Sequence, residues 1–488
     1  MKKKSNTVEL FTKSVGKFVN NDFLLLDESL SLKDGIKQLQ ENKKSTILLK
    51  NKKGLAGIIT EKDIARKVVF KFKETQLLKE VMTKNVKFVF ADDLLFHAVG
   101  KMRKNNFNHL PVLNQKYEVL GMIDMSHALS AELGDITEHI DNMSFDEEDI
   151  ESLKKIKKQQ ITIAESMLSR NLFPFDITYL LSFLNNVIYR RAIRVAEKKI
   201  SKLNIIKTIP NYSVIVMGSG GRMESFLHPD QDNGIIYELS DGDDPVQVDK
   251  YFEQLAKEFT KTLDDCDIPF CKGDLMASNP LWRKSFIDWK KQIDHWLLSH
   301  KPQDMRNIDM LYDFKSVYGA SYLADDLKKY INEKFKERKY LKFLYYSEEQ
   351  SDAAIGFFGQ FILEKNDEEN KGLLNLKHTG TLPLVESIRL YSIKNNISFT
   401  NTLERLDELE KKEVFTKDEV DFYKNAHKFM SNILLKNQIE RVKKGLQIKN
   451  FINPKNLSIR EKGILKIYLK KIRELKTKVR GDIGEEYF

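Results

Sequence analysis

The chain has 488 residues, 41% of them hydrophobic and 31% charged, with a formal net charge of +10. This length exceeds what one hydrophobic core normally serves, so we expect about three domains of an ordinary globular composition. No apolar run approaches the ~20 residues of a membrane helix, and no apolar core follows the basic start MKKKSNTVELFTKS. We therefore expect no membrane association, no secretion and a cytoplasmic location. The two cysteines, Cys266 and Cys271, fit a reducing compartment and are interpreted as packing residues.

Residues 1–21 are predicted to form an N-terminal tail, and an internal repeat of about 64 residues follows it. Residues 23–69 are typical of strand, helix, strand, strand and helix, and residues 86–133 repeat this order. The repeat, which we place at 22–134, resembles a tandem pair of CBS (cystathionine-β-synthase-like) domains. The resemblance implies an adenine nucleotide site between the repeats and a homodimer formed through their helices.

The segment GIITEKD at 57–63 matches the ligand motif of the CBS family. A threonine hydroxyl and a helix N-terminus suit phosphate, and an aspartate suits ribose hydroxyls, so Thr60 and Asp63 are the candidate CBS ligand residues. A helix cap with Thr60 as the N-cap residue is an alternative, and both interpretations can hold together. In the second repeat Asp124 replaces the threonine and would repel phosphate, so we expect at most one good nucleotide site.

Residues 135–204 combine acidic patches with long stretches of 3.6-residue apolar periodicity. We interpret them as a helical connector that would carry a change of CBS shape to the following domain.

The chemistry of the chain is concentrated in residues 213–237, SVIVMGSGGRMESFLHPDQDNGIIY, where the pattern predicts strand, Gly-rich turn, short helix and strand. Glycines let backbone N–H groups approach an anion closely, so Gly218 and Ser219 are candidate phosphate-binding residues. On a strand, residues two apart project from one face, so Asp230 and Asp232 would present two carboxylates to one Mg²⁺ or Mn²⁺ ion.

This order and spacing resemble the nucleotidyltransferase superfamily, in which Gly-Ser is followed about ten residues later by Asp-x-Asp. The fuller pattern, which adds Arg222, Glu224 and Asn233, resembles CBS-associated nucleotidyltransferases related to the PII-protein uridylyltransferases. The resemblance implies a catalytic domain, placed at 205–300, in which Arg222 would offset triphosphate charge and Glu224 would have an orienting role.

Superfamily members usually recruit a third carboxylate from a later strand, and Asp274 is the candidate here. The alternative that Asp274 is only a turn residue after Gly273 remains open. Trp282, Trp289 and Trp296 recur every seven residues and are interpreted as a buried helix stripe rather than a base-stacking site.

Residues 301–488 are predicted to form a C-terminal helical domain, and the segments 309–319 and 376–389 resemble that domain of the same family. Asp313, Lys377 and Arg389 would either face the nucleotide or form ordinary ion pairs.

Residues 440–480 contain 14 Lys or Arg and three acidic residues. A nucleic-acid contact is one interpretation of this charge. We favour the other interpretation, in which the cations form the solvated face of an amphipathic helix.

The predicted fold class is α+β with several domains: a tandem CBS pair, a nucleotidyltransferase-fold mixed sheet with helices, and a C-terminal helical domain. The predicted function is Mg²⁺-dependent transfer of a nucleoside monophosphate from a nucleoside triphosphate (NTP) to a hydroxyl, regulated by adenine nucleotide at the CBS pair. The resemblance implies a PII-like signalling protein as the acceptor. Two alternatives remain: transfer to RNA or to a small molecule, and a non-enzymatic adenine nucleotide sensor with a vestigial transferase site.

Overall fold

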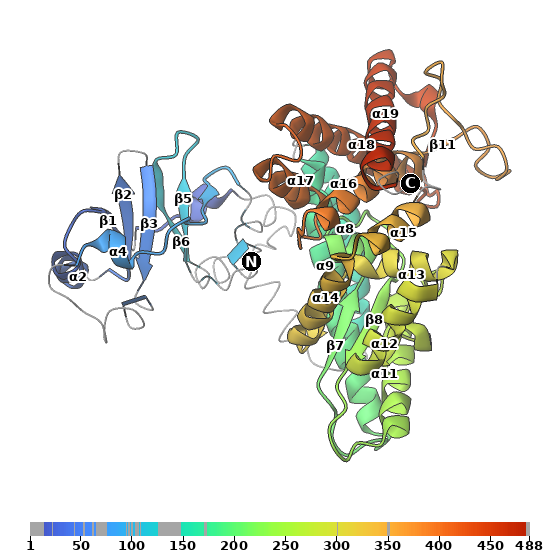
Figure 1. Cartoon of the computed structure of the whole chain (residues 1–488), viewed down its shortest axis with the longest axis horizontal. Coiled ribbons are helices and arrows are strands. Elements are labelled where there is room, and N and C mark those ends of the chain that lie inside the picture. The colour runs from blue at the N-terminus through green and yellow to red at the C-terminus, as the bar shows by residue number, and fades with distance from the viewer. Residues whose placement is uncertain are drawn as a thin grey trace, which may run out of the picture. The chain divides into compact units, whose positions relative to one another are not determined.

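The computed structural model describes residues 14–21, 23–42, 44–51, 54–60, 63–64, 76–93, 95, 98, 101–102, 107, 109–124, 148–169, 173–299, 301–348 and 352–484. The chain forms two compact units, 1–144 and 145–488, and each is described by itself (Figure 1).

The first unit contains two three-stranded sheets of the same topology. Its elements are η1 (Val15–Phe18), β1 (Leu24–Asp27), α2 (Leu32–Glu41), β2 (Thr46–Asn51), β3 (Gly54–Thr60), α4 (Leu78–Val81), β4 (Val89–Phe90), β5 (His109–Leu113) and β6 (Val119–Asp124). In each sheet the first strand pairs parallel with the second, and the second pairs antiparallel with the third. The predicted internal repeat is therefore confirmed at the level of strand pairing.

The start of the chain differs from the predicted tail. Val15 is fully buried, its amide donates to the carbonyl of Asp93, and Asn20 forms a bridge with Met122. Residues 14–20 therefore pack on the second repeat, because the apolar side chains of η1 are buried there. The part of the predicted tail at 1–13 lies outside the described residues.

The second unit contains a mixed four-stranded sheet with the order β10-β7-β8-β9. Its strands are β7 (Tyr212–Val216), β8 (Asn233–Tyr237), β9 (Arg283–Ser285) and β10 (Lys315–Gly319). β7 pairs antiparallel with both β8 and β10, whereas β8 pairs parallel with β9. β7 and β8 are buried along their whole length, which places them in the middle of the domain.

Helices cover both faces of this sheet (Figure 1). Val214 and Ile235 pack in one apolar cluster with α9 (Pro174–Ser201) and α11 (Pro245–Asp265). Ile215 belongs to a second cluster, on the opposite face, with α12 (Phe286–Ser299), α13 (Pro302–Tyr312) and α14 (Ser321–Phe335). Successive strand residues point to opposite faces, so one short apolar strand supplies both cores.

The second cluster continues into the C-terminal helices. The elements of this C-terminal region, which include two short strands, are α15 (Arg338–Glu348), β11 (Leu374–Asn375), η5 (Lys377–Thr381), α16 (Leu382–Lys394), α17 (Thr402–Lys411), α18 (Lys417–Lys443), β12 (Phe451–Ile452), η6 (Pro454–Asn456), α19 (Ile459–Val479) and η7 (Arg480–Gly484). α19 begins with a capping box between Ser458 and Glu461, and its apolar stripe, including Leu465 and Ile472, is buried. The basic end of the chain is therefore a packed helix with an outer cationic face, as the favoured interpretation predicted.

Two predicted boundaries differ from the structure. The region from residue 301 is not purely helical, because it contributes β10, the edge strand of the four-stranded sheet, which pairs with β7. α8 (Glu148–Ser169) and α9, interpreted as a connector, belong to the second unit, where α8 packs on α9 and α11. Local periodicity identified the helices but not the sheet that they cover.

The three tryptophans are buried and in mutual contact, with ring centroids 5.8–6.4 Å apart, as predicted for a packing role. Trp282 lies in the 3₁₀ turn η4 (Pro280–Trp282) rather than in the helix that carries the other two. Among the helices that the structure describes, none has the length and apolar content needed to cross a bilayer.

Candidate active site

The predicted Gly-rich turn forms the one-turn helix α10 (Gly218–Arg222), which follows β7, so the predicted turn and short helix are one element. Gly218 has a φ of +55°, which favours glycine, and a Cβ there would lie 3.4 Å from Oδ2 of Asp232. A Cβ on Gly221 would lie 2.1 Å from the backbone oxygen of Asp313. The two glycines thus let the turn approach the carboxylate on one side and the segment before β10 on the other.

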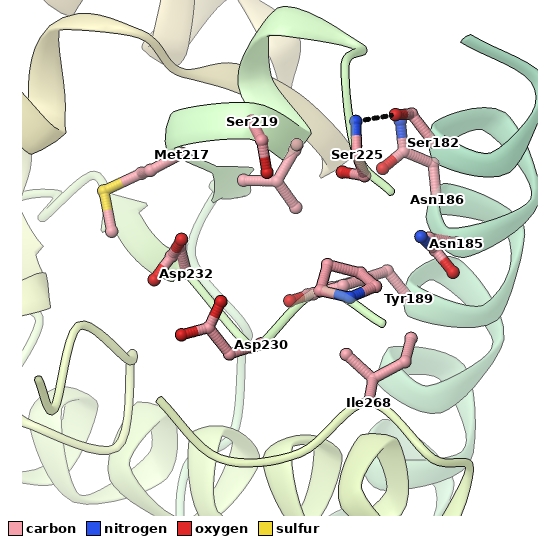
Figure 2. A pocket seen from close by; sticks show the side chains of 13 residues that line it. Ser182, Asn185, Asn186, Tyr189, Met217, Ser219, Ser225, Asp230, Asp232 and Ile268 are labelled. Carbon is pink, nitrogen blue, oxygen red and sulfur yellow. Dashed lines mark hydrogen bonds between the residues drawn. The ribbon is translucent and has the colours of Figure 1, made fainter. Parts of the chain in front are cut away.

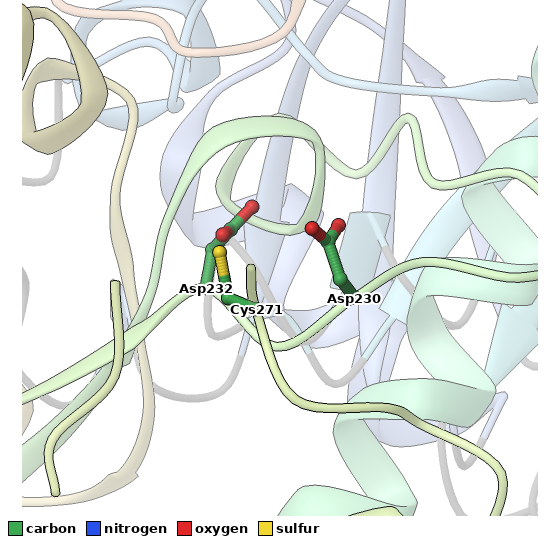
Figure 3. A group of neighbouring side chains, drawn as sticks. All are labelled: Asp230, Asp232 and Cys271. Atoms are coloured by element: carbon green, nitrogen blue, oxygen red, sulfur yellow. The ribbon is translucent and has the colours of Figure 1, made fainter. Parts of the chain in front are cut away.

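Asp230 and Asp232 precede β8, and their carboxylates converge as predicted (Figure 3). The residue between them holds them in place: Gln231 is fully buried, and its Nε2 donates to the carbonyls of Thr260 and Ile268. Because Gln231 points into the domain, its two neighbours face the pocket.

The electrostatics of this pair fit a divalent cation. Burial and the neighbouring charge of Asp230 raise the pKa of Asp232 to about 7, although Asp230 itself is exposed. Ligand atoms of Asp230, Asp232 and Cys271 all lie within 4.8 Å of one another. Two hard carboxylates suit Mg²⁺ or Mn²⁺, which would relieve the repulsion between them.

Cys271 has a more specific position than a packing residue. Its thiol hydrogen-bonds to Asp232 and lowers the pKa of that carboxyl, while burial and Asp232 raise the pKa of the thiol itself to about 12. In this structure the thiol acts as a hydrogen-bond donor to the carboxylate.

Asp274 does not join this group. It is exposed, has a φ of +55°, and its carboxylate accepts a hydrogen bond from Nδ2 of Asn279 at 3.0 Å. The alternative interpretation as a turn residue describes this geometry. Among the residues that the structure describes, the metal-ligand group contains two carboxylates and no third.

Arg222 and Glu224 do not face the pocket as predicted phosphate-binding residues. Arg222 is 8% exposed, and its Nε donates to Glu224 at 2.9 Å and its Nη1 to Asp313 at 3.1 Å. Glu224 also accepts from the amide of Thr402 at 2.7 Å, at the start of α17. Both residues fasten the turn to the C-terminal helices, because a buried charge requires partners that sequence spacing does not reveal.

Asp313 is the centre of this ion cluster. It is fully buried and accepts hydrogen bonds from Arg222, Arg389 and Arg405. Although burial raises the pKa of Asp313, the three guanidinium groups hold it well below its ordinary value. Sequence analysis left two roles open for Asp313 and Arg389, contact with the nucleotide or an ordinary ion pair. The structure places both residues in ion pairs.

Lys377 is a second cation that acts on the carboxylate pair. Its positive charge, like that of Arg222, lowers the pKa of Asp232, although neither residue lines the pocket. Lys377 is half-buried at the start of η5, a π-helical turn. π-turns are frequent at functional sites.

α9 forms a wall of the pocket that sequence analysis missed (Figure 2). Ser182, Asn185, Asn186 and Tyr189 line the pocket together with Ser219, Asp230 and Asp232. Their spacing of three, four and seven residues marks one helix face. That polar stripe was the signal available in the sequence.

In the first unit, Thr60 and Asp63 bond to each other. The Thr60 hydroxyl accepts from the Asp63 amide at 3.3 Å, and the Asp63 carboxylate accepts from the Thr60 amide and hydroxyl at 3.1 and 2.9 Å. This is the cap geometry weighed as an alternative, and a ligand role stays a prediction. Asp124 ends β6 as Thr60 ends β3, and residues 125–127 lie outside the described residues.

Three family models match the chain. The model described as "Putative nucleotidyltransferase DUF294" matches residues 158–303, and "Putative nucleotidyltransferase substrate binding domain" matches residues 338–483. The model described as "CBS domain" matches residues 15–69 and 78–134. The first match begins within α8, so it includes the helices that we had interpreted as a connector.

Similar curated proteins include the CBS domain-containing protein CBSCBSPB2 of Arabidopsis thaliana, which is 33% identical over 109 residues, 22% of this chain. The match covers 20% of the length of this relative. Among solved structures, a CBS domain protein from Pyrobaculum aerophilum complexed with AMP is 21% identical, covers 26% of this chain and 96% of its own, and has a TM-score of 0.23.

Proposed function

The chain belongs to the DUF294 nucleotidyltransferase family in a form that carries a CBS pair, and on this premise we propose that it transfers a nucleoside monophosphate from an NTP to a hydroxyl. The observation that carries the proposal is the convergence of Asp230 and Asp232 beside the turn of Gly218 and Ser219.

In the proposed reaction the acceptor hydroxyl oxygen attacks the α-phosphorus in line, a new P–O bond forms, and the bond to the β-phosphate breaks so that pyrophosphate leaves. Asp230 and Asp232 would hold Mg²⁺ or Mn²⁺, which neutralises developing phosphate charge when bound. Ser219 donates its hydroxyl to a phosphate oxygen, and Lys377 offsets triphosphate charge. The hydroxyl proton passes to solvent, since no third carboxylate lies in the described site.

We propose a signalling protein as the acceptor. Phe357 and Phe358 are 92% and 89% exposed at the tip of a hairpin. At the base of that hairpin the Ala354 amide donates to the carbonyl of Thr379, in the turn that carries Lys377. Exposed aromatic side chains beside a site are typical of protein contacts.

Regulation by adenine nucleotide is part of the same proposal. Thr60 and Asp63 stand at the end of β3 in the family's ligand motif, and a nucleotide would exchange their mutual hydrogen bonds for contacts with phosphate and ribose. A homodimer formed through the CBS helices and a cytoplasmic location complete the proposal.

Two alternatives each have one supporting observation. The outer cationic face of α19 favours RNA as the acceptor, which a steep salt dependence of binding would reveal. The lack of a third carboxylate in the described metal group favours a sensor with a vestigial transferase site.

The test is incubation of the full chain with Mg²⁺ and each α-labelled NTP, with and without cell extract. The Asp230→Asn/Asp232→Asn variant is the negative control, and Asp264→Asn/Asp265→Asn, two exposed carboxylates at the end of α11, is the matched control. Label transferred by the wild type and the matched control alone supports the enzyme, and protease or RNase treatment of the product identifies the acceptor class. No transfer and no pyrophosphate release, with adenine nucleotide still bound, would favour the sensor.

A further inference from the structure

Asn185 presents a buried hydrogen-bond donor to the pocket. Its side chain lines the pocket with Asp230 and Asp232, yet the residue is only 4% exposed. Its Nδ2 has no hydrogen-bond partner among the residues that the structure describes. Buried donors are almost always paired, so this one points to a partner that is not part of the chain.

The orientation of this amide is fixed by its neighbours. Oδ1 of Asn185 accepts from Nζ of Lys157 at 3.1 Å and from Nε2 of Gln160 at 2.9 Å. Because two donors from separate side chains converge on this oxygen, the amide nitrogen faces away from them. Figure 2 shows the nitrogen of Asn185 turned toward the pocket and the oxygen turned away.

The support behind Asn185 is itself complete. Nζ of Lys157 donates three hydrogen bonds, to Asn185, to Oε1 of Gln160 and to the carbonyl of Leu227, all at 3.1 Å. The ammonium is 6% exposed and has no donor left for a ligand. The cluster therefore holds one amide rigidly and leaves only Nδ2 of that amide free.

The surroundings of Nδ2 indicate what it would bind. Tyr189, Asn186 and Ser182 on the same helix face are neutral, and Val216 and Ile268 add apolar contacts. Phosphate would be better served by Ser219 and by a cation held at Asp230 and Asp232, which also line the pocket. The cavity there is only about 20 Å³, so Nδ2 could receive one small neutral group, such as a hydroxyl or carbonyl oxygen, rather than a whole nucleoside.

We propose that Asn185 is a nucleoside-binding residue, whose Nδ2 donates to a neutral oxygen of the NTP, either a ribose hydroxyl or a base carbonyl. Lys157 and Gln160 are positioning residues that keep the amide in this orientation. The inference rests on the proposed function, since it assumes that an NTP occupies the metal site.

The test measures equilibrium binding of non-hydrolysable α,β-methylene analogues of UTP and ATP with Mg²⁺, by calorimetry on the full chain. Asn185→Asp keeps the shape and the bond to Lys157 but replaces the donor with an acceptor, so we expect at least tenfold weaker binding. Asn185→Ser serves as a second variant if the aspartate impairs folding. The matched control is Asn366→Asp, an exposed amide whose replacement should leave affinity unchanged.

The identity of the ligand oxygen follows from a cycle of protein and nucleotide changes. If the partner is a ribose hydroxyl, the wild type binds 2′-deoxy or 3′-deoxy analogues more weakly than the parent nucleotide. Asn185→Asp then binds the deoxy analogue and the parent nucleotide equally well. If it is a base carbonyl, the variant loses UTP affinity and keeps its affinity for ATP, whose base has no carbonyl.

Two negative outcomes are distinguishable. Wild-type affinity retained by both Asn185 variants would overturn this inference while leaving the proposed function intact, because water would then be the partner of Nδ2. Failure of the wild type to bind any NTP analogue with Mg²⁺ would overturn both.

Discussion

At the scale of single residues, Asp313 shows how one buried charge fixes a site that it does not touch. Its carboxylate accepts from Arg222 of the catalytic turn and from Arg389 and Arg405 of the C-terminal helices. All four residues are buried, so each charge depends on the others for compensation. Loss of the carboxylate would remove one partner from each of three buried guanidinium groups behind the Gly-rich turn.

We therefore expect Asp313→Asn to destabilise the second unit by about 3–5 kcal/mol, since breaking a buried ion pair leaves uncompensated charge. The measurement is urea unfolding, with Asp264→Asn as the exposed control. The folded pKa of Asp313 is lowered, so its contribution is present above its unfolded pKa and is lost only in strong acid. A loss of stability between pH 5 and 8 that occurs in the wild type and not in Asp313→Asn would contradict this account.

Lys157 gives a pH dependence of the same sign at higher pH. Burial lowers the pKa of its ammonium to about 7, below that of an unfolded lysine. Between pH 7 and about 10 the unfolded chain binds more protons at this residue, so stability should rise with pH by up to ~1.4 kcal/mol per unit. Lys157→Met should flatten that slope in urea unfolding at pH 7, 8 and 9. Equal slopes in variant and wild type would show that Lys157 titrates normally.

At the scale of elements, the geometry of α10 depends most on the close approach at Gly221. A Cβ on Gly221 would meet the backbone of Asp313 at 2.1 Å, whereas a Cβ on Gly220 would meet Val216 at an ordinary 3.6 Å. Adjacent glycines in one turn thus provide a matched pair for testing the packing.

Gly221→Ala should destabilise the second unit by roughly 3 kcal/mol through overpacking against backbone that cannot move aside. Gly220→Ala should be neutral or slightly stabilising, because alanine has the higher helix propensity. Thermal unfolding of the two variants measures the difference. Equal melting temperatures would mean that the turn and the segment before β10 separate more easily than the structure indicates.

The π-turn η5 brings a cation from the C-terminal helices to the carboxylate pair. We expect Lys377→Met to weaken binding of the Mg²⁺–NTP complex about tenfold, because a charge that offsets triphosphate is lost. Lys371→Met, at an exposed lysine nearby in the chain, is the control. Calorimetry with the α,β-methylene analogues measures both variants, and unchanged affinity in Lys377→Met would exclude it from the nucleotide site.

At the scale of the whole molecule, the chain joins two compact units with separate cores. A ligand that binds one unit should therefore stabilise that unit first. Regulation requires a further step, in which nucleotide at the CBS pair changes the activity of the other unit.

Adenine nucleotide at about 100 times its Kd should stabilise the CBS unit by about 2.7 kcal/mol. Asp63→Ala should remove this ligand-induced shift, and Asp92→Ala, an exposed carboxylate of the second repeat, should retain it. Differential scanning calorimetry with and without AMP or ATP gives the ligand-induced shift of each variant. Because each variant is compared with its own ligand-free form, the loss of the helix cap in Asp63→Ala does not affect the comparison. A shift that persists in Asp63→Ala would place the nucleotide elsewhere.

The sequence alone determined the features that depend on near neighbours in the chain. The internal repeat shows in the local pattern of each copy, and the strand–helix–strand order around Gly218 and the convergence of Asp230 and Asp232 follow from spacings of two to a few residues. Backbone conformation and side-chain direction over such distances are set locally, which is why these predictions held.

The tertiary structure decided every feature that depends on a distant partner. Arg222 and Glu224 match the family pattern but are turned toward Asp313 and Thr402, and β10 is a strand because it pairs with β7. The polar face of α9 reaches the pocket only because α9 packs on the catalytic sheet. A buried charge or donor must find its partner wherever the fold supplies one, and sequence spacing does not encode which distant segment that will be.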